Sequence, residues 1–291
     1  MCSSDLKVLQ ECGAVICAAG SGLAPADKKL YALRDVTATV EAIPLIASSI
    51  MSKKIAEGTS ALVLDVKTGN GAFMSDPKRA KELASVMVDL GKAAGVKTRA
   101  LVTAMDQPLG LTAGNALEVQ ESIEVLQGGG PKDVVDLTIL LAREMLELVG
   151  VQSKDPESAL RDGSAMDIWK KMVRAQGGDP DAPLPKSREA HQISATESGT
   201  ISSMHALKVG VAAWRLGAGR SRQGEQVQSG AGVVIHKKPG EEIKAGEPLF
   251  TLHTDEAERF ERAIEAISSA VEISKDGTVA PHLPLVVDRI S

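Results

Sequence analysis

Four polar side chains that could bind a flat, carbonyl-rich ligand lie in one stretch of the chain, on two predicted helices: Tyr31, Arg34, Ser49 and Lys53. The first helix is predicted over residues 26–36, because Pro25 suits the first helical position and Asp27 the first turn. Tyr31 and Arg34 are three residues apart, so they share a face of this helix. A guanidinium on that face would match a planar acceptor edge.

The second predicted helix begins at Pro44 and carries a hydroxyl and an ammonium on its apolar stripe. With 3.6 residues per turn, Ile46, Ser49 and Lys53 fall within about 60° of one another. One interpretation is a small pocket between two helices that offers a guanidinium, an ammonium and a hydroxyl to a ligand. The other is a surface helix on which the stem of Lys53 covers apolar neighbours while its charged end reaches water. The residues alone leave both interpretations open.

A parallel sheet is predicted to support these helices. Residues 61–66 (ALVLDV) form the continuous apolar run typical of a buried parallel strand, and residues 98–103 form a second strand. The helix predicted between them, residues 76–94, gives a unit with a right-handed crossover. Because open α/β sheets bind ligands at the carboxyl ends of their strands, the loop after the first strand should bring Phe73 to the pocket. Residues 14–18 are predicted as another buried strand.

The chain changes character after a proline-rich stretch at residues 177–188. Beyond it, short β-like segments alternate with turns, and KKPGEEIKAGEPLFTLH has the spacing of a barrel-sandwich hairpin. The predicted fold class is α/β, with a parallel or mixed sheet, flanking helices, a partial all-helical lobe near the N-terminus and a C-terminal α+β module like a barrel-sandwich. Further helices are predicted at residues 113–126, 132–149, 155–178 and 206–216. The predicted domains are residues 1–25 (a remnant of the α/β domain), 26–57 (the helical lobe segment), 58–180 (the α/β domain) and 189–291 (the C-terminal module).

Composition and charge exclude several kinds of protein. A net charge of −5 over 291 residues argues against a surface for nucleic acid. No stretch reaches the ~20 apolar residues that a membrane helix needs, so no membrane partner is expected. The three cysteines and five histidines show no metal-ligand spacing, which fits a reduced, cytoplasmic protein without a zinc site. No cofactor is predicted.

The segment DKKLYALRDVTATVEAIPLIASSIMSKKIAEG resembles the signature of the thymidine and pyrimidine-nucleoside phosphorylase family. The resemblance continues through ALVLDVKTGNGAFM, TAMDQPLGLTAGNALEVQESIEVLQGGGP and LGAGRSRQG, and covers nearly the whole chain after about residue 10. It implies that one set of residues holds the pyrimidine edge: Arg34, Ser49 and Lys53. It implies that another set walls the nucleoside pocket: Tyr31, Ile46 and Phe73. It also implies a potassium ion held by two backbone carbonyls, of Leu109 and Thr112, and by the carboxylate of Glu121, oxygen ligands that suit a hard cation.

The implied reaction converts thymidine and phosphate to thymine and 2-deoxyribose 1-phosphate, so a pyrimidine nucleoside and phosphate are the expected partners. Arg34 and Lys53 would act in catalysis by holding the departing base, whose negative charge grows in the transition state. A homodimer formed through the helical lobe is also expected.

One departure from the family pattern opens alternatives. The glycine-rich phosphate loop of the form Lys-x-Ser-x-Gly-Gly has no match in this sequence. We therefore expect an N-terminally truncated enzyme that holds the base without turning it over, because phosphate needs backbone N–H groups and hydroxyls. The alternatives are a natural variant that has lost phosphate chemistry, a non-catalytic base-binding or dimerisation fragment, and a related phosphoribosyltransferase.

Overall fold

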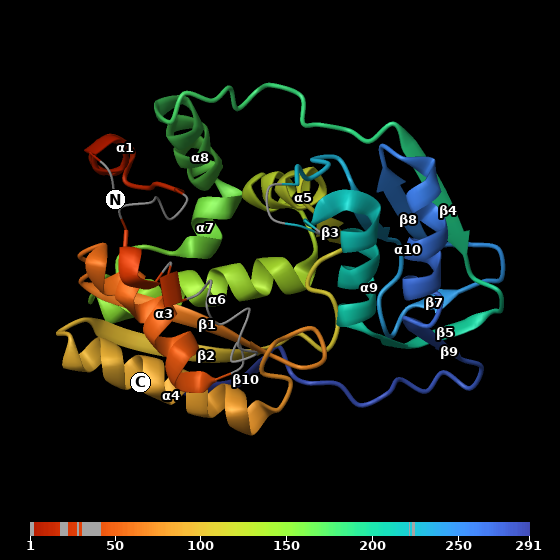
Figure 1. The fold of residues 1–291 in the computed structure, drawn as a ribbon, viewed down its shortest axis with the longest axis horizontal. Coiled ribbons are helices and arrows are strands. Elements are labelled where there is room, and N and C mark those ends of the chain that lie inside the picture. The colour runs from red at the N-terminus through yellow and green to blue at the C-terminus, as the bar shows by residue number, and fades with distance from the viewer. Residues whose placement is uncertain (1–2, 18–22, 28, 31–41, 221, 223–224) are drawn as a thin grey trace.

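The computed structural model describes residues 3–17, 23–27, 29–30, 42–220, 222 and 225–291. Figure 1 shows two bodies side by side: a sheet with helices on both faces, and a smaller body of antiparallel strands packed with helices. Residues 25–27 and 29–30 are helical, as the prediction of the first helix requires. Tyr31 and Arg34 lie outside the described residues, so their predicted roles stay predictions.

The first sheet has three strands in the order β1-β2-β10. Strand β1 (Ala61–Thr68) runs parallel to β2 (Lys97–Ala104), and helix α4 (Pro77–Ala93) connects them. This confirms the predicted unit of two parallel strands with a helix between them. Strand β10 (Val286–Ile290) pairs antiparallel with β2, so the last residues of the chain return to this sheet.

Helix α3 (Ile43–Ala56) belongs to the core of the first sheet. It starts with a proline in its first turn and packs on α4. Buried side chains of α3 meet buried side chains of α4 and of both parallel strands; they include Ile43, Ala47, Met51, Leu64, Val66, Met87 and Val102. This packing fixes the rotation of α3, and with it the direction in which Ser49 and Lys53 point.

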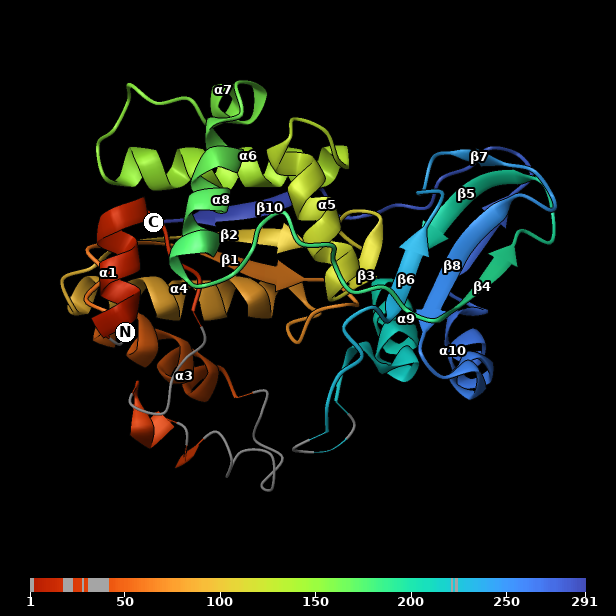
Figure 2. The same cartoon turned by 90° about the horizontal axis from the view of Figure 1, so that it is seen from above.

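The opposite face of the sheet is covered by helix α6 (Lys132–Leu148), as Figure 2 shows. Ion pairs attach α6 to the sheet: Glu144, which is 6% exposed, pairs with Arg99 of β2 and with Arg289 of β10. Helix α1 (Ser3–Cys12) packs on α8 (Ser164–Ala175). The other helices of this body are α5 (Ala116–Leu126) and α7 (Pro156–Arg161).

The buried strand predicted at residues 14–18 is wrong for the part that is described. Residues 14–17 have no regular secondary structure, and Ile16 is 72% exposed. An apolar run becomes a strand only where another strand offers ladder hydrogen bonds, and none of the described strands pairs with this run. Instead Val15 packs beside Met172 of α8, and Gln176 donates a hydrogen bond to the carbonyl of Ile16 (2.6 Å).

The second body consists of two antiparallel sheets, ordered β3-β6-β8-β4 and β7-β5-β9, with helices α9 and α10. Their apolar side chains form one core, which includes Ile201, Leu216, Val233, Phe250 and Leu252. The elements are β3 (Thr112–Gly114), β4 (Glu189–Ser194), β5 (Gly199–Met204), α9 (Ala206–Ala213), β6 (Gly232–Ile235), β7 (Glu242–Ile243), β8 (Pro248–Thr254), a short helical turn Ala257–Arg259, α10 (Phe260–Ile267) and β9 (Val271–Ser274). Strand β3 comes from the first body and pairs with β6, so it links the two bodies.

Three predicted helices have different bounds in the structure. The helix expected from residue 113 starts at Ala116, because residues 112–114 pair as strand β3. The stretch 155–178 is broken into α7 and α8 at Gly163, whose φ of 79° leaves the helical region. Helix α9 ends at Ala213 and continues as a π-helical turn, Trp214–Ala218, which contains Gly217 at φ 105°.

No helix in the described part of the chain has both the length and the apolar composition needed to cross a membrane.

Candidate functional site

The hydroxyl and the ammonium predicted on helix α3 do lie together. Lys53 donates a hydrogen bond to Ser49, with Nζ 3.1 Å from Oγ. It also forms an ion pair with Asp27, with Nζ 2.6 Å from Oδ2. Ser49 is 7% exposed, and about a quarter of the Lys53 side chain reaches solvent. The charged end of Lys53 is thus held by two partners while part of the side chain reaches solvent, so both interpretations of this helix stay open.

A cavity of about 420 Å³ opens beside this pair. It lies between α3, α4, strand β1 and the loop that follows β1, and its lining includes Ile46, Ser49, Ile50, Val66, Phe73, Met74, Leu83, Met87 and Met105. Phe73 is 77% exposed and stands at the rim, where it could close over a ligand. Lys53 is not part of the lining, but it supports Ser49, which is.

The structure thus brings four of the predicted site residues to one place: Ile46, Ser49, Lys53 and Phe73. Arg34 and Tyr31, which lie outside the described residues, are the other two. Three of the four come from α3, one helical turn apart, as its period predicted. Phe73 comes from the loop after β1, where ligands of α/β sheets are expected.

Sequence reasoning missed a polar cluster on strand β1 and its neighbour β2. Lys67 makes an ion pair with Asp65 (2.7 Å) and donates a hydrogen bond to Thr103 on β2 (3.0 Å), and Thr103 donates to Asp65. Asp65 and Lys67 also line the cavity. A signal was present, since two opposite charges two residues apart on a strand share a face. The apolar run on either side of this pair hides the signal.

Asp27 was also missed as a partner of Lys53. The sequence shows it only as an acidic residue in the first turn of a helix, which is a common position with its own explanation. Its contact with Lys53 spans 26 residues of sequence, so local spacing gives no signal for it.

The loop that carries Phe73 is held by the backbone around it. Gly69 has φ 114°, and a Cβ there would lie 2.5 Å from the backbone nitrogen of Asp106. Asn70 donates a hydrogen bond to the carbonyl of Asp106 (2.7 Å) and accepts one from the backbone of Leu207 at the start of α9 (3.2 Å). The glycine is therefore required, and Asn70 ties this loop to both bodies.

The predicted cation ligands lie near one another at the start of β3. Glu121 is buried, and its Oε1 accepts a hydrogen bond from the backbone of Leu111 (2.8 Å). Burial raises the pKa of its carboxyl group, and the charges of Asp133 and Glu118 add to this. The hydroxyl of Thr112 lies near this carboxyl group and acts to lower its pKa. The hydroxyl oxygen is buried and has no well-aligned hydrogen-bond partner in the described part of the chain.

A lysine from the second body reaches the same loop. Lys238 donates to the carbonyl oxygens of Pro108 and Gly110, the second at 3.0 Å, and pairs with Asp133 (3.1 Å). The carbonyl oxygens of Pro108 and Gly110, on either side of Leu109, thus already bind one positive group, the ammonium of Lys238. Among the described residues, no cluster of three or more histidines, cysteines or acidic residues is arranged to hold a metal ion.

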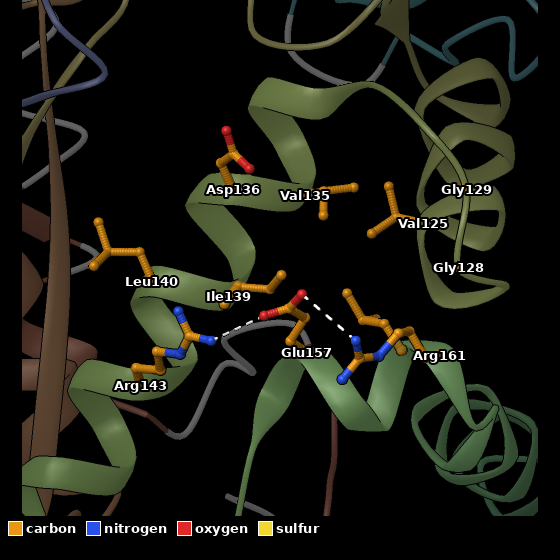
Figure 3. Close-up of a pocket in the computed structure, with 11 residues that line it drawn as sticks. Val125, Gly128, Gly129, Val135, Asp136, Ile139, Leu140, Arg143, Glu157 and Arg161 are labelled. Atoms are coloured by element: carbon orange, nitrogen blue, oxygen red, sulfur yellow. Dashed lines mark hydrogen bonds and ion pairs between the residues drawn. The ribbon is translucent and has the colours of Figure 1, made fainter.

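A second cavity, of about 540 Å³, lies between α5, α6 and α7 and contains none of the predicted site residues. Figure 3 shows Arg143 and Arg161 on either side of Glu157 at this cavity. Arg143 pairs with Glu157 at 3.2 Å and Arg161 at 3.9 Å. Because both guanidinium groups face the same carboxylate, we assign no ligand to this cavity.

Comparison with known proteins identifies the class. Residues 4–166 match the profile of the family described as "Glycosyl transferase family, a/b domain". Residues 200–274 match that of the "Pyrimidine nucleoside phosphorylase C-terminal domain". The first match covers more than half of the 291 residues, so the chain belongs to the glycosyl transferase family with this a/b domain.

Named relatives narrow the comparison. The chain is 59% identical over 283 residues to a thymidine phosphorylase of Mycobacterium tuberculosis, an alignment that covers 97% of this chain and 65% of the relative. It is 46% identical over 280 residues to a pyrimidine-nucleoside phosphorylase of Geobacillus stearothermophilus, covering 92% of this chain and 64% of that protein. A pyrimidine-nucleoside phosphorylase of Staphylococcus haemolyticus is 42% identical over 296 residues, and this alignment covers 98% of the chain and 67% of that protein. The chain therefore spans a little under two thirds of the length of the first two relatives.

Proposed function

We propose that this chain carries the pyrimidine-binding part of a nucleoside phosphorylase that converts thymidine and phosphate to thymine and 2-deoxyribose 1-phosphate. The observation that supports this most directly is the contact between Ser49 and Lys53 beside a cavity that Ile46 and Phe73 also line. The names of the relatives, thymidine phosphorylase and pyrimidine-nucleoside phosphorylase, point to the same substrates.

The proposed chemistry assigns Lys53 to the departing base. An oxygen of phosphate forms a bond to C1′ of the sugar as the bond from C1′ to N1 of the pyrimidine breaks, and the electron pair stays on the base. The base therefore gains negative charge, and an ammonium group next to it stabilises the transition state more than the neutral substrate. Arg34, which the sequence predicts on the preceding helix, is proposed to act in the same way.

The remaining residues would set the position of the base. Ser49 can donate to a ring carbonyl or accept from a ring N–H, because its hydroxyl does both. Ile46 and Phe73 would hold the flat faces of the ring through apolar contact, with Tyr31 as the third wall residue. Buried neighbours hold Ser49 in place, which limits the entropy lost on binding.

Two measurements on the same preparation test this proposal. The chain is incubated with thymidine and phosphate while released thymine is followed by chromatography, and thymine binding is measured by calorimetry. Release of thymine supports the phosphorylase. Thymine binding without release supports either a truncated phosphorylase or a non-catalytic base-binding fragment. Absence of both contradicts the proposed site, and product formed only from a free pyrimidine and 5-phosphoribosyl 1-diphosphate would indicate a phosphoribosyltransferase.

We also propose a potassium ion at the carbonyls of Leu109 and Thr112 and the carboxylate of Glu121. The ammonium of Lys238 at this loop pairs with Asp133, so the buried carboxylate of Glu121, beside the buried hydroxyl of Thr112, still lacks a positive charge of its own among the described residues. A hard cation with oxygen ligands would supply it.

Thermal unfolding tests this cation site without an activity assay. Potassium chloride should raise the unfolding midpoint above that in tetramethylammonium chloride of equal ionic strength, since a ligand of the folded state stabilises it. Glu121→Gln should remove this difference, whereas Glu118→Gln, which changes an exposed carboxylate one turn away, should keep it. An equal difference in both variants would contradict the site.

A homodimer through the helical lobe and a cytoplasmic location complete the proposal. Sedimentation velocity over a range of protein concentrations tests the dimer, and a single monomeric species at all concentrations would contradict it.

A further inference from the structure

The loop at residues 108–111 is held from both bodies. From the second body, the ammonium of Lys238 donates hydrogen bonds to the carbonyl oxygens of Pro108 and Gly110, the second at 3.0 Å. From the first body, the carboxylate of Asp133 on α6 accepts from the backbone N–H of Gly110 (3.1 Å) and pairs with the same ammonium (3.1 Å). Lys238 therefore ties this loop to the second body, and Asp133 ties it to α6.

The pairing of β3 with β6, where the two bodies meet (Figure 2), decides where the next carbonyl oxygens point. Ile235 donates its backbone N–H to the carbonyl of Leu111 (2.7 Å), and Thr112 stands opposite Val234 in the register. Hydrogen-bonded and non-hydrogen-bonded pairs alternate along an antiparallel ladder. Thr112 and Val234 therefore form a non-hydrogen-bonded pair, and the carbonyl of Thr112 points away from β6.

The side of β3 that faces away from β6 is the side of helix α5. Gly114 comes two residues after Thr112, so its backbone N–H points the same way, and it donates to the carboxylate of Glu118 on α5 (2.8 Å). Glu121 lies three residues further along α5 and so shares a face with Glu118. The carbonyl of Thr112 and the buried carboxylate of Glu121 thus lie on the same side of β3.

The charges around this loop leave one carboxylate without a cation. The ammonium of Lys238 is balanced by Asp133, whereas Glu121 has no cationic partner among the described residues. The contacts of Lys238 include the carbonyls before and after Leu109 but not that of Leu109 itself. The second body therefore takes some of the carbonyl oxygens of this loop and leaves others for a cation beside Glu121.

Given the proposed potassium site, we infer that Lys238 is a positioning residue for it, so that cation binding depends on the contact between the two bodies. Lys238 holds the peptide groups on either side of Leu109, and β6 holds that of Leu111. The carbonyls of Leu109 and Thr112 are then left for the cation. The ammonium does not touch the cation, because like charges repel, and it acts by fixing the backbone that carries the ligands.

A potassium titration followed by thermal unfolding tests this role without an activity assay. Ionic strength is kept constant with tetramethylammonium chloride, and the potassium concentration at half of the rise in unfolding midpoint reports the apparent affinity. Lys238→Met should raise this concentration at least about tenfold, since loss of a partner that orients metal ligands commonly costs that much affinity. The matched control Lys237→Met, which removes the same charge from the same turn, should leave it nearly unchanged.

The sign of the change separates positioning from simple electrostatics. Removal of a positive charge near a cation site would by itself lower the potassium concentration that is needed. A higher concentration for Lys238→Met therefore reports the loss of backbone geometry. Lys238→Gln keeps a shorter, neutral donor and should show the same rise, so it provides the test if Lys238→Met does not fold.

Hydrogen exchange of the Gly110 amide measures the clamp in the absence of potassium. This N–H donates to the carboxylate that Lys238 holds, so the amide should exchange about tenfold faster in Lys238→Met than in the unchanged chain. Lys237→Met should leave the exchange at Gly110 as it is. The measurement needs no bound cation, so it reports on Lys238 alone.

Several results would overturn the inference. A potassium concentration that stays the same or falls in both variants of Lys238, or that rises equally in Lys237→Met, would contradict the positioning role while leaving the potassium site intact. Unchanged exchange at Gly110 in Lys238→Met would contradict the clamp. If potassium does not stabilise the unchanged chain, the potassium site and the inference fall together. Thymine binding in the same samples tests the base site separately.

Discussion

Nζ of Lys53 lies 3.1 Å from Oγ of Ser49, one turn earlier on the same helix, and 2.6 Å from a carboxylate oxygen of Asp27. The ammonium thus bridges α3 and the helical residues before it, and keeps the Ser49 hydroxyl oriented at the edge of the cavity. A ligand that accepts a hydrogen bond could share this ammonium with Asp27 without moving α3. This geometry leads to the first prediction.

Replacing Lys53 by alanine should weaken thymine binding by about ten- to a hundredfold, because a hydrogen bond from a charged group contributes about 1.5–3 kcal/mol. Calorimetry on the purified chain measures it. The matched control is Lys54→Ala, which removes the next lysine of α3, paired with Glu57 instead (3.1 Å). Equal thymine affinity in the two variants would remove Lys53 from the site.

Gly110→Ala should lower the free energy of unfolding by about 2–4 kcal/mol. Gly110 has φ 71°, which an L-residue adopts at a cost, and a Cβ there would overlap the buried carboxylate of Glu121. Gly95→Ala is the control, because Gly95 has φ 76° but no atom lies within 4 Å of the added Cβ. Its free energy of unfolding should fall by only about 1 kcal/mol. Urea denaturation measures the free energy of unfolding of both variants. Similar losses would show that Glu121 moves aside and that the overlap with the added Cβ costs little.

Glu144→Ala should destabilise the first sheet by about 1.5–3 kcal/mol, because it removes the buried partner of Arg99 and leaves that guanidinium only the exposed Glu147. Glu147 lies on the same helix and contacts the same two arginines, but it is 61% exposed. Glu147→Ala should therefore cost about 1 kcal/mol or less. Guanidinium denaturation measures both, and a loss for Glu147→Ala as large as that for Glu144→Ala would contradict this assignment.

The turn at Asp276 should make stability depend on pH in the acid range. Hydrogen bonds from Ser274 and Thr278 lower the pKa of the Asp276 carboxyl from 3.8 to about 2. A lowered pKa in the folded state stabilises the fold above the unfolded value of 3.8, and this contribution is lost as the pH falls toward about 2. The difference in unfolding midpoint between the wild type and Asp276→Asn should therefore shrink over this range. A difference that stays constant down to about pH 2 would contradict the pKa shift.

Local patterns predicted much of this architecture. The apolar run of β1, the start of α4 at Pro77 and the parallel pairing with β2 follow from periodicity and turn residues, which act over a few positions. The spacing of Ile46, Ser49 and Lys53 on α3 likewise follows from helical geometry alone. These features could be predicted because neighbouring residues decide them.

Contacts between distant segments could not be predicted in this way. The partner of Lys53 is 26 residues earlier, and β10 joins the first sheet from the end of the chain. The run at residues 14–17 has the composition of a strand, but a strand also needs a partner, which composition does not reveal. Thr103 could not be predicted as a partner of Asp65 and Lys67 for the same reason, because it comes from another strand.

The location of the base is the most direct test of the proposed site. Crystals of the chain grown with 5-bromouracil would place the bromine by anomalous scattering, since bromine replaces the methyl group of thymine. We predict one strong peak in the cavity between α3 and Phe73, with a polar edge of the ring within hydrogen-bond distance of Ser49 Oγ or Lys53 Nζ. A peak elsewhere in the chain, with this cavity empty, would contradict the proposed site.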